Sequence, residues 1–309
     1  MSLTALQEIQ SAKVSQGTVL TIGTFDGVHR GHQAIISAVI DRAKKDAYLA
    51  GCITFKASPR ETLRPQQSFR YLMSLEERID MLRNSGLDLV LPLTFDLDLA
   101  SVEAGEFVNY LVDYLNLKHL IVGPDFALGY KRKGTIEVLR EIGQNKGFTV
   151  ESIDSTDMSS DRVSSTRLRR LLSEEGNVEL AERLLGRPHS IESSVIKGHE
   201  RGRTIGYRTA NIAVPINRII PLDGVYVTST TLGSNKYPSV TNVGDNPTFD
   251  DKALSVETYI LDFDRMIYDE TIRVEFLRRI RGEIKFETVS KLTEQIALDV
   301  QDAREYFAK

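Results

Sequence analysis

The sequence predicts two domains of different class: an α/β domain with a parallel sheet, then a small antiparallel β-barrel. The 309 residues are enough for two domains, each with its own hydrophobic core. From residue 18 to about residue 153, apolar strand-like runs alternate with segments of helical periodicity. Beyond residue 186, short β-branched runs are separated by turn-forming residues. We therefore expect domains over residues 1–185 and 186–309.

The first half alternates strands and helices. Ser74 and Glu77 have the spacing of a capping box and mark the start of one helix. This order of elements predicts a parallel sheet with helices on both faces, with ligands at the carboxyl ends of its strands. The expected strands cover residues 19–22, 52–55, 89–93, 119–122 and 148–153, and the expected helices cover residues 33–47, 75–82, 102–115 and 136–146.

The second half contains six short strand-like runs with turn signals between them, which predict an antiparallel barrel. The tail from Thr288 carries apolar residues at helical spacing, so we expect a closing helix that packs on the barrel. The expected strands cover residues 191–196, 209–214, 224–232, 237–242, 256–261 and 271–276, and the helix is expected to bury Val289, Leu292, Ile296, Val300, Ala303 and Phe307.

The composition is that of an ordinary globular protein, with 41% hydrophobic and 27% charged residues. A net charge of −4 argues against a nucleic-acid partner. No apolar stretch reaches about 18 residues, and the N-terminus lacks a signal pattern, so we expect a cytoplasmic protein without a membrane partner. The lone cysteine, Cys52, lies in an apolar run and is expected to be a buried strand thiol.

The tetrad His29-Arg30-Gly31-His32 is the most informative motif. It follows an apolar strand-like run and opens a helix, where a βα unit binds phosphate. Two imidazoles three residues apart on a first helical turn face the same way, and the glycine lets a phosphate approach the backbone N–H groups. A pair of helix-start histidines without a ligand is the alternative interpretation.

A second polar segment enters a helix at residues 164–169. Hydroxyl groups at the N-terminus followed by arginines one turn later suit phosphate binding, although a capped, solvated helix has the same pattern. Its combination with the histidine tetrad favours a nucleotide site. The residues concerned are Ser164, Ser165, Thr166 and Arg169, with Leu168, Leu171 and Leu172 on the apolar side.

These motifs, in this order, resemble the bacterial bifunctional riboflavin kinase/FAD synthetase family from about residue 18 to residue 305. Their joint order is far more specific than any one of them. The matching patterns are GxFDGxHxGH at residues 23–32, VGxDF at 122–126, SSTR(I/L)R at 164–169, GRxxGxxTAN at 202–211, GVY at 224–226, NVGxxPTF at 242–249 and VExxILDF at 256–263.

The resemblance implies that the first domain is a Rossmann-like nucleotidyltransferase, which joins the AMP part of ATP to FMN and releases pyrophosphate. Such chemistry requires neutralised phosphate charge rather than a covalent nucleophile. His29 and His32 are then the catalytic donors to the α-phosphate and the leaving group. The implied nucleotide-binding residues are Gly23, Phe25, Asp26, Gly31, Asp125, Ser164, Ser165, Thr166 and Arg169, with Phe25 and Asp125 on the nucleotide and flavin side.

For the second domain the resemblance implies a barrel of riboflavin kinase type, which phosphorylates riboflavin with ATP. The sequence contains no GxxxxGK[ST] pattern, so a Walker-type kinase is excluded. Thr209 and Asn211 would hold Mg²⁺ and phosphate oxygens, and Glu257 would be the general base for the ribityl 5′ hydroxyl. Gly198 and Gly202 are the implied nucleotide-binding glycines. The expected small-molecule partners are riboflavin, FMN, FAD and ATP.

Two segments depart from the family pattern. Arg208 stands where a proline usually precedes the TAN motif, and it either loosens that loop or adds a cation near the phosphates. Residues 56–59 retain only the last proline of a Pro-His-Pro-like segment, and the departure puts a flavin or phosphate contact there in doubt. Smaller departures lie at Thr24, Ala127 and Leu128, and residues 281–286 are a candidate for the isoalloxazine side.

These departures leave alternatives open. The chain could be a monofunctional FAD synthetase, or a flavin-binding regulatory paralogue with an impaired kinase half. A cytidylyltransferase would share the histidine chemistry, but it would leave the barrel without a role. The retained Thr209, Asn211 and Glu257 favour a working kinase.

Overall fold

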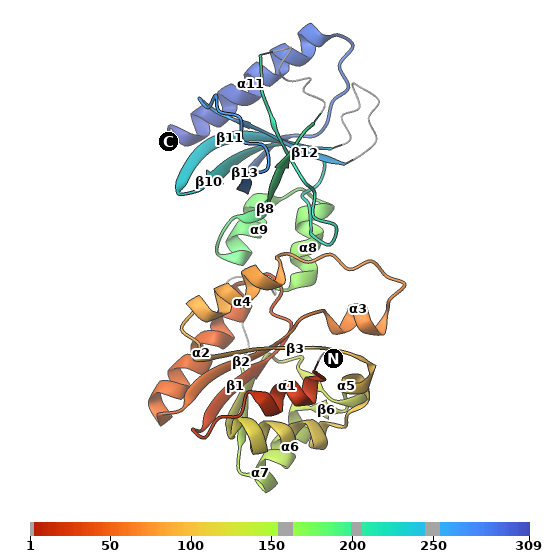
Figure 1. Ribbon diagram of the computed structural model, residues 1–309, viewed down its shortest axis with the longest axis vertical. Coiled ribbons are helices and arrows are strands. Elements are labelled where there is room, and N and C mark those ends of the chain that lie inside the picture. Colours follow the sequence, from red (N-terminus) through yellow and green to blue (C-terminus); the bar gives the residue numbers. More distant parts are fainter. Residues whose placement is uncertain (1–2, 154–162, 199–205, 245–253) are drawn as a thin grey trace. The chain divides into compact units, whose positions relative to one another are not determined.

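The computed structural model describes residues 3–153, 163–198, 206–244 and 254–309 (Figure 1). It contains two compact units, residues 1–69 with 74–164 and residues 70–73 with 165–309. Residues 165–185, which the sequence analysis assigned to the first domain, pack within the second unit. Which catalytic half they serve stays a prediction. Within the described residues, no helix combines the length and apolarity needed to cross a bilayer.

The first unit is built on a five-stranded parallel sheet, which confirms the prediction. The central strand β1 is buried along its whole length. It pairs in parallel with β2 on one side and β4 on the other. The strands are β1 (Thr18–Ile22), β2 (Leu49–Phe55), β3 (Leu89–Leu93), β4 (Leu117–Val122) and β7 (Thr149–Ser152), in the order β3-β2-β1-β4-β7.

Helices cover both faces of this sheet, as expected (Figure 1). Helix α4 begins with the anticipated capping box, in which Ser74 and Glu77 each accept from the other's backbone N–H at 3.1 and 2.7 Å. Cys52 in β2 is fully buried, and burial raises the pKa of its thiol. The helices are α1 (Ala5–Ser11), α2 (Arg30–Asp46), α3 (Pro59–Leu63), α4 (Leu75–Asn84), α5 (Leu97–Ser101), α6 (Ala104–Leu115) and α7 (Ile136–Lys146), with a short hairpin of β5 (Ala127–Leu128) and β6 (Gly134–Thr135).

The second unit contains the closed six-stranded antiparallel barrel that the sequence predicts. Four of its strands differ in length from the expected six-residue runs: β9 is shorter, with three residues, and β8, β11 and β13 are longer, with eight, ten and eleven residues. The strands are β8 (His189–Ile196), β9 (Ala210–Ile212), β10 (Gly224–Leu232), β11 (Asn235–Gly244), β12 (Ser255–Ile260) and β13 (Thr271–Arg281), preceded by α8 (Ser165–Ser173) and α9 (Val178–Leu185).

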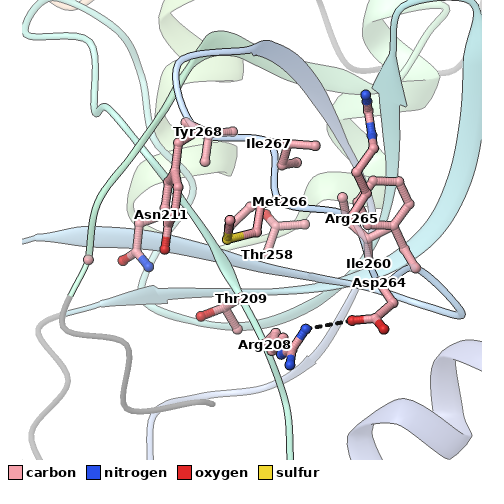
Figure 2. Close-up of a pocket in the computed structure, with 14 residues that line it drawn as sticks. Arg208, Thr209, Asn211, Thr258, Ile260, Asp264, Arg265, Met266, Ile267 and Tyr268 are labelled. Carbon is pink, nitrogen blue, oxygen red and sulfur yellow. Dashed lines mark hydrogen bonds and ion pairs between the residues drawn. The ribbon is translucent and has the colours of Figure 1, made fainter.

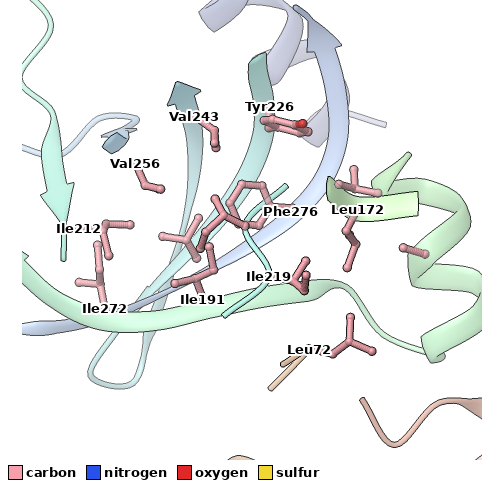
Figure 3. Packing of buried hydrophobic residues seen from close by; sticks show 14 of the residues in the cluster. Leu72, Leu172, Ile191, Ile212, Ile219, Tyr226, Val243, Val256, Ile272 and Phe276 are labelled. Carbon is pink, nitrogen blue, oxygen red and sulfur yellow. The ribbon is translucent and has the colours of Figure 1, made fainter. Parts of the chain in front are cut away.

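An apolar cluster joins buried side chains of the barrel strands to those of α8 (Figure 3). The rings of Tyr226 and Phe276 meet edge to face with centroids 5.4 Å apart. Residues 70–73 join this unit because Leu72 packs in the cluster and its carbonyl accepts from Arg218 at 3.4 Å. The short segment is thus held by both burial and hydrogen bonding.

A chain of buried hydroxyl groups crosses the barrel interior, which sequence patterning did not predict. Four hydrogen bonds of 2.8 to 2.9 Å link five side chains from three neighbouring strands. All five are fully buried, so each hydroxyl obtains from its neighbours the partners that water would supply. In order, the chain runs Thr230, Ser239, Thr228, Thr241 and Thr258.

The closing helix α11 (Val289–Phe307) packs against β10 and β11, as expected. Ala303 is fully buried and Val300 packs in the same small cluster, but Val289 and Phe307 are 52% and 39% exposed, so their predicted burial was wrong. The buried face centres on Asp299 and Ala303, and the ends of the helix project beyond it. An apolar periodicity alone does not reveal that a carboxylate occupies the centre.

We predict that Asp299→Ala destabilises the barrel unit. Arg281 donates two hydrogen bonds from Nε and one from Nη2 to this carboxylate, which is 2% exposed. Removing one partner of a buried pair costs about 3–5 kcal/mol. Denaturant unfolding should show this loss in the free energy of unfolding. The matched control is Glu287→Gln, which removes the exposed pair with Lys291 and should cost under about 1 kcal/mol. Equal effects of the two variants would contradict the assignment.

Candidate active sites

The loop that follows β1 has an unusual backbone. Phe25, Gly27 and Val28 have φ values of +51°, +85° and +38°. A β-branched residue rarely adopts a positive φ, and such strain persists only where surrounding contacts enforce it. Here the Val28 N–H donates to the Phe25 carbonyl at 3.0 Å, and the Gln33 amide donates to the Val28 carbonyl at 2.8 Å. The loop is therefore held in one strained conformation directly before the histidine tetrad.

The two histidines lie together at the start of α2. His29 is the N-cap, and its Nδ1 accepts from the His32 backbone N–H at 3.3 Å. The imidazole rings stack with centroids 3.6 Å apart and planes 16° apart, which confirms that they face the same way. Gly31 is buried between them. The arrangement places two imidazoles beside the N–H groups of a helix N-terminus, which attract anions.

Other residues of the loop after β1 pack next to the histidines. The Phe25 ring lies 4.9 Å from the His32 ring and is buried. A Cβ at Gly23 would lie only 3.1 Å from that ring, so a larger residue there would require the ring to shift. Asp26 is buried as well, with 1% exposure. The structure thus brings Gly23, Phe25 and Asp26 to the tetrad.

Arg78 of α4 lies buried at the same edge of the sheet. Its guanidinium donates to the carbonyls of Thr24, just beyond β1, at 2.8 Å and of Phe55, the last residue of β2, at 2.6 Å. Sequence reasoning missed this residue because its acidic neighbours suggest a solvated helix face. Its spacing could have identified it: Arg78 lies three residues after Leu75 and four before Leu82, on the apolar face of the helix.

His32 is a neutral base in this setting. Burial holds the pKa of its imidazole well below the ordinary value, and the nearby His29 and Arg78 lower it further. Its Nδ1 is buried and has no hydrogen-bond partner among the described residues. At pH 7 the ring therefore carries one N–H to donate and no charge of its own.

The remaining residues of the first site follow other strands. Asp125 lies in the turn after β4, the strand beside β1, and is exposed; its carbonyl accepts from Arg132 at 2.7 Å. In the segment that departs from the family pattern, Lys56 donates to Glu8 at 2.6 Å and Ser58 caps α3. Residues 56–59 thus have structural contacts of their own.

Ser165 and Thr166 form the first turn of α8, directly after Ser164. Arg169 lies one turn later, and its Nε donates to the Arg70 carbonyl at 2.8 Å. The predicted apolar side of this helix is confirmed, because Leu168, Leu171 and Leu172 are buried. That these hydroxyls and Arg169 act together with the two histidines stays a prediction.

In the barrel, Gly198, Thr209 and Asn211 of the expected kinase residues line a pocket of about 180 Å³ (Figure 2), and Glu257 lies next to Thr209 without lining it. Thr209 Oγ1 donates to Glu257 Oε2 at 3.1 Å, and Asn211 pairs with Glu257 across β9 and β12. Glu257 is half-buried. The pocket is lined by Val195, Gly198, Arg208, Thr209, Ala210, Asn211, Thr258, Ile260, Phe263, Asp264, Arg265, Met266, Ile267 and Tyr268.

Glycines allow close approaches around this pocket. A Cβ at Gly198 would collide with the side-chain amide of Asn211, so that amide packs directly on the glycine backbone. A Cβ at Gly244 would likewise meet the carboxylate of Glu283, in the segment considered for the isoalloxazine side. Gly202 lies outside the described residues.

The oxygen atoms of Thr209, Asn211 and Glu257 suit Mg²⁺, which prefers hard oxygen ligands. The described residues contain no group of three histidine, cysteine or acidic side chains that could hold a metal ion. A magnesium ion here would therefore depend on substrate phosphates and water for most of its ligands, as is common for this ion at nucleotide sites.

Taken together, the fold and the two clusters define a two-site transferase that uses nucleotides. A sequence model described as FAD synthetase matches residues 11–167, and one described as riboflavin kinase matches residues 185–307. The chain belongs to the bifunctional riboflavin kinase/FMN adenylyltransferase family. Enzymes of that name from Haemophilus influenzae and Pseudomonas fluorescens are 36% and 39% identical to it, over 96% and 94% of this chain and 96% and 93% of theirs.

A solved structure also matches nearly the whole chain. It is titled a macrolide-efflux protein from Streptococcus pneumoniae, and it is 34% identical with a TM-score of 0.87, covering 96% of each chain. The likeness supports both folds described above. The family assignment rests on the two sequence models and on the curated relatives, which share one name.

We predict that His32 makes the first unit less stable at acidic pH. Because its pKa is lower in the folded chain, the unfolded chain binds a proton as pH falls below about 6.5 while the folded chain does not, so stability falls as pH falls. Between pH 7.5 and 5.5, thermal unfolding should show a larger fall in Tm for the unmodified protein than for His32→Asn. Equal falls would contradict the buried, neutral assignment.

Proposed function

We propose that the barrel phosphorylates riboflavin to FMN and that the parallel-sheet unit adenylylates FMN to FAD, with ATP as the donor in both reactions. The observation that carries the proposal is that one chain contains two separate clusters, the stacked His29 and His32 and the joined Thr209, Asn211 and Glu257. Each cluster has the chemistry that one of the two reactions needs.

In FAD formation, a phosphate oxygen of FMN attacks the α-phosphorus of ATP in line, and the bond to pyrophosphate breaks. His29 and His32 donate hydrogen bonds to the α-phosphate and the leaving group, next to the N–H groups of α2. Ser164, Ser165, Thr166 and Arg169 hold the β- and γ-phosphates. Gly23 and Gly31 allow the backbone to approach the nucleotide, with Phe25, Asp26 and Asp125 around it.

In FMN formation, Glu257 accepts the proton of the ribityl 5′ hydroxyl as that oxygen attacks the γ-phosphorus of ATP and ADP leaves. The hydrogen bond from Thr209 orients this carboxylate. Thr209 and Asn211 would hold Mg²⁺, which neutralises phosphate charge when bound. Gly198 and Gly202 are the proposed nucleotide-binding glycines, and a cytoplasmic location is part of the proposal.

The direct test is turnover by the purified protein. With riboflavin, ATP and Mg²⁺, chromatography should show FMN first and then FAD. Accumulation of FMN without FAD would contradict the assignment of the first unit. FAD made only from supplied FMN would indicate a monofunctional FAD synthetase, and tight flavin binding without turnover would indicate a regulatory paralogue.

Single substitutions should separate the two activities. His32→Ala should abolish FAD formation and leave FMN formation largely intact, because the change removes a donor from the first site only. Glu257→Ala should do the reverse, because it removes the base of the barrel site. Initial rates of the two reactions, each with its own flavin substrate, measure both effects. Equal loss of both activities in either variant would contradict two independent sites.

A further inference from the structure

Arg208 lies at the rim of the barrel pocket beside Thr209 (Figure 2). Its Nη1 donates to Asp264 Oδ1 at 2.6 Å, so Asp264 is its acidic partner within the described part of the chain. The two side chains are 60% and 86% exposed. The guanidinium therefore stands in solvent at the pocket entrance, next to a residue of the proposed phosphate site.

The pair with Asp264 is easily exchanged. Ion pairs this exposed contribute little, and salt screens them further. A guanidinium binds phosphate more strongly, because its planar fork can donate two parallel hydrogen bonds to an anion of higher charge. A triphosphate that reached Thr209 would thus compete effectively with Asp264 for Arg208.

The pocket rim carries a second arginine in a different orientation. Arg265 pairs with Glu270 at 3.2 Å and extends away from Thr209 (Figure 2). The segment before β9 is itself well anchored without Arg208, because the Tyr207 ring meets the Tyr259 ring at 5.3 Å and Thr209 bonds to Glu257. Arg208 is therefore not needed to hold this segment and remains available to a ligand.

We propose that Arg208 is a phosphate-binding residue of the kinase half, held by Asp264 until the triphosphate of ATP displaces that carboxylate. This inference rests on the proposed function of the barrel. Arg208 then adds a cation where the family pattern has a proline, which has neither charge nor a backbone N–H. Asp264 then competes with the phosphate of the substrate for Arg208. The alternative is that the ion pair between Arg208 and Asp264 only stabilises the loop conformation.

Substitutions on the two sides of the pair distinguish these roles. If Arg208 binds phosphate, Arg208→Ala should raise the KM for ATP in riboflavin phosphorylation about 5- to 20-fold, with kcat within about threefold. Arg208→Lys should recover part of the loss. Asp264→Asn should lower that KM, because it releases the guanidinium. If the ion pair only stabilised the loop, Arg208→Ala and Asp264→Asn would both break it and would both raise the KM for ATP.

Two controls accompany these variants. Arg304 of α11 pairs with Asp262 at 2.6 Å, which is another exposed pair near the loop after β12, and neither residue lines the pocket. Arg304→Ala should leave the KM for ATP within about twofold. The KM for ATP in FMN adenylylation, measured on the same preparations, should be unchanged. The double variant Arg208→Ala, Asp264→Asn should match Arg208→Ala alone, because Asp264 acts only through Arg208.

The outcomes separate this inference from the proposed function. If the unmodified protein does not phosphorylate riboflavin, the proposed function of the barrel fails. If it does so and Arg208→Ala leaves the KM for ATP unchanged, or Asp264→Asn raises that KM, only the role of Arg208 is overturned. Opposite shifts of the KM in the two variants support it.

Discussion

Every buried backbone carbonyl and N–H group needs a partner, and both candidate sites lie where the regular strand pairing stops supplying one. At the carboxyl ends of β1 and β2, the guanidinium of Arg78 donates hydrogen bonds to the carbonyls of Thr24 and Phe55. In the barrel, β9 pairs with β12 only through Ala210 and Asn211. The pocket is lined by residues of this short pairing and by Ile260, which lies beyond it on β12.

The two sites use positive charge in different ways. At the first site the charge of Arg78 is buried and fixed by hydrogen bonds, so it is in place before any ligand arrives. At the second site the arginines are exposed and paired with exposed carboxylates. Burial is the main cause of the lowered pKa of His32, and the fixed charge of Arg78 lowers that pKa further. An exposed charge can change partners when an anion binds.

The sequence was sufficient for the order of the elements and for the pairing of His29 with His32, because these depend on local patterns. The roles of the site residues stay predictions. The apolar runs gave the parallel strands and the barrel, and the tetrad gave the stacked histidines. The sequence did not predict the contacts between segments that are distant along the chain. Arg78 looked like a surface residue, the ends of α11 looked buried, and nothing local indicated that Leu72 would pack with the barrel. Such features depend on which surfaces meet, and a single sequence does not encode that as a periodic pattern.

The hydroxyl chain inside the barrel has a consequence for how this sequence can change. Thr228 and Thr241 lie within the chain, and each hydrogen-bonds to two neighbours. Replacing either with valine leaves both buried neighbours short of a hydrogen-bond partner, whereas replacing all five residues with apolar ones leaves no polar group unpaired. The effects of substitutions at these five positions on stability are therefore not additive. Replacing the five residues one at a time passes through less stable intermediates. We expect polar-to-apolar substitutions at these positions to occur together among related sequences.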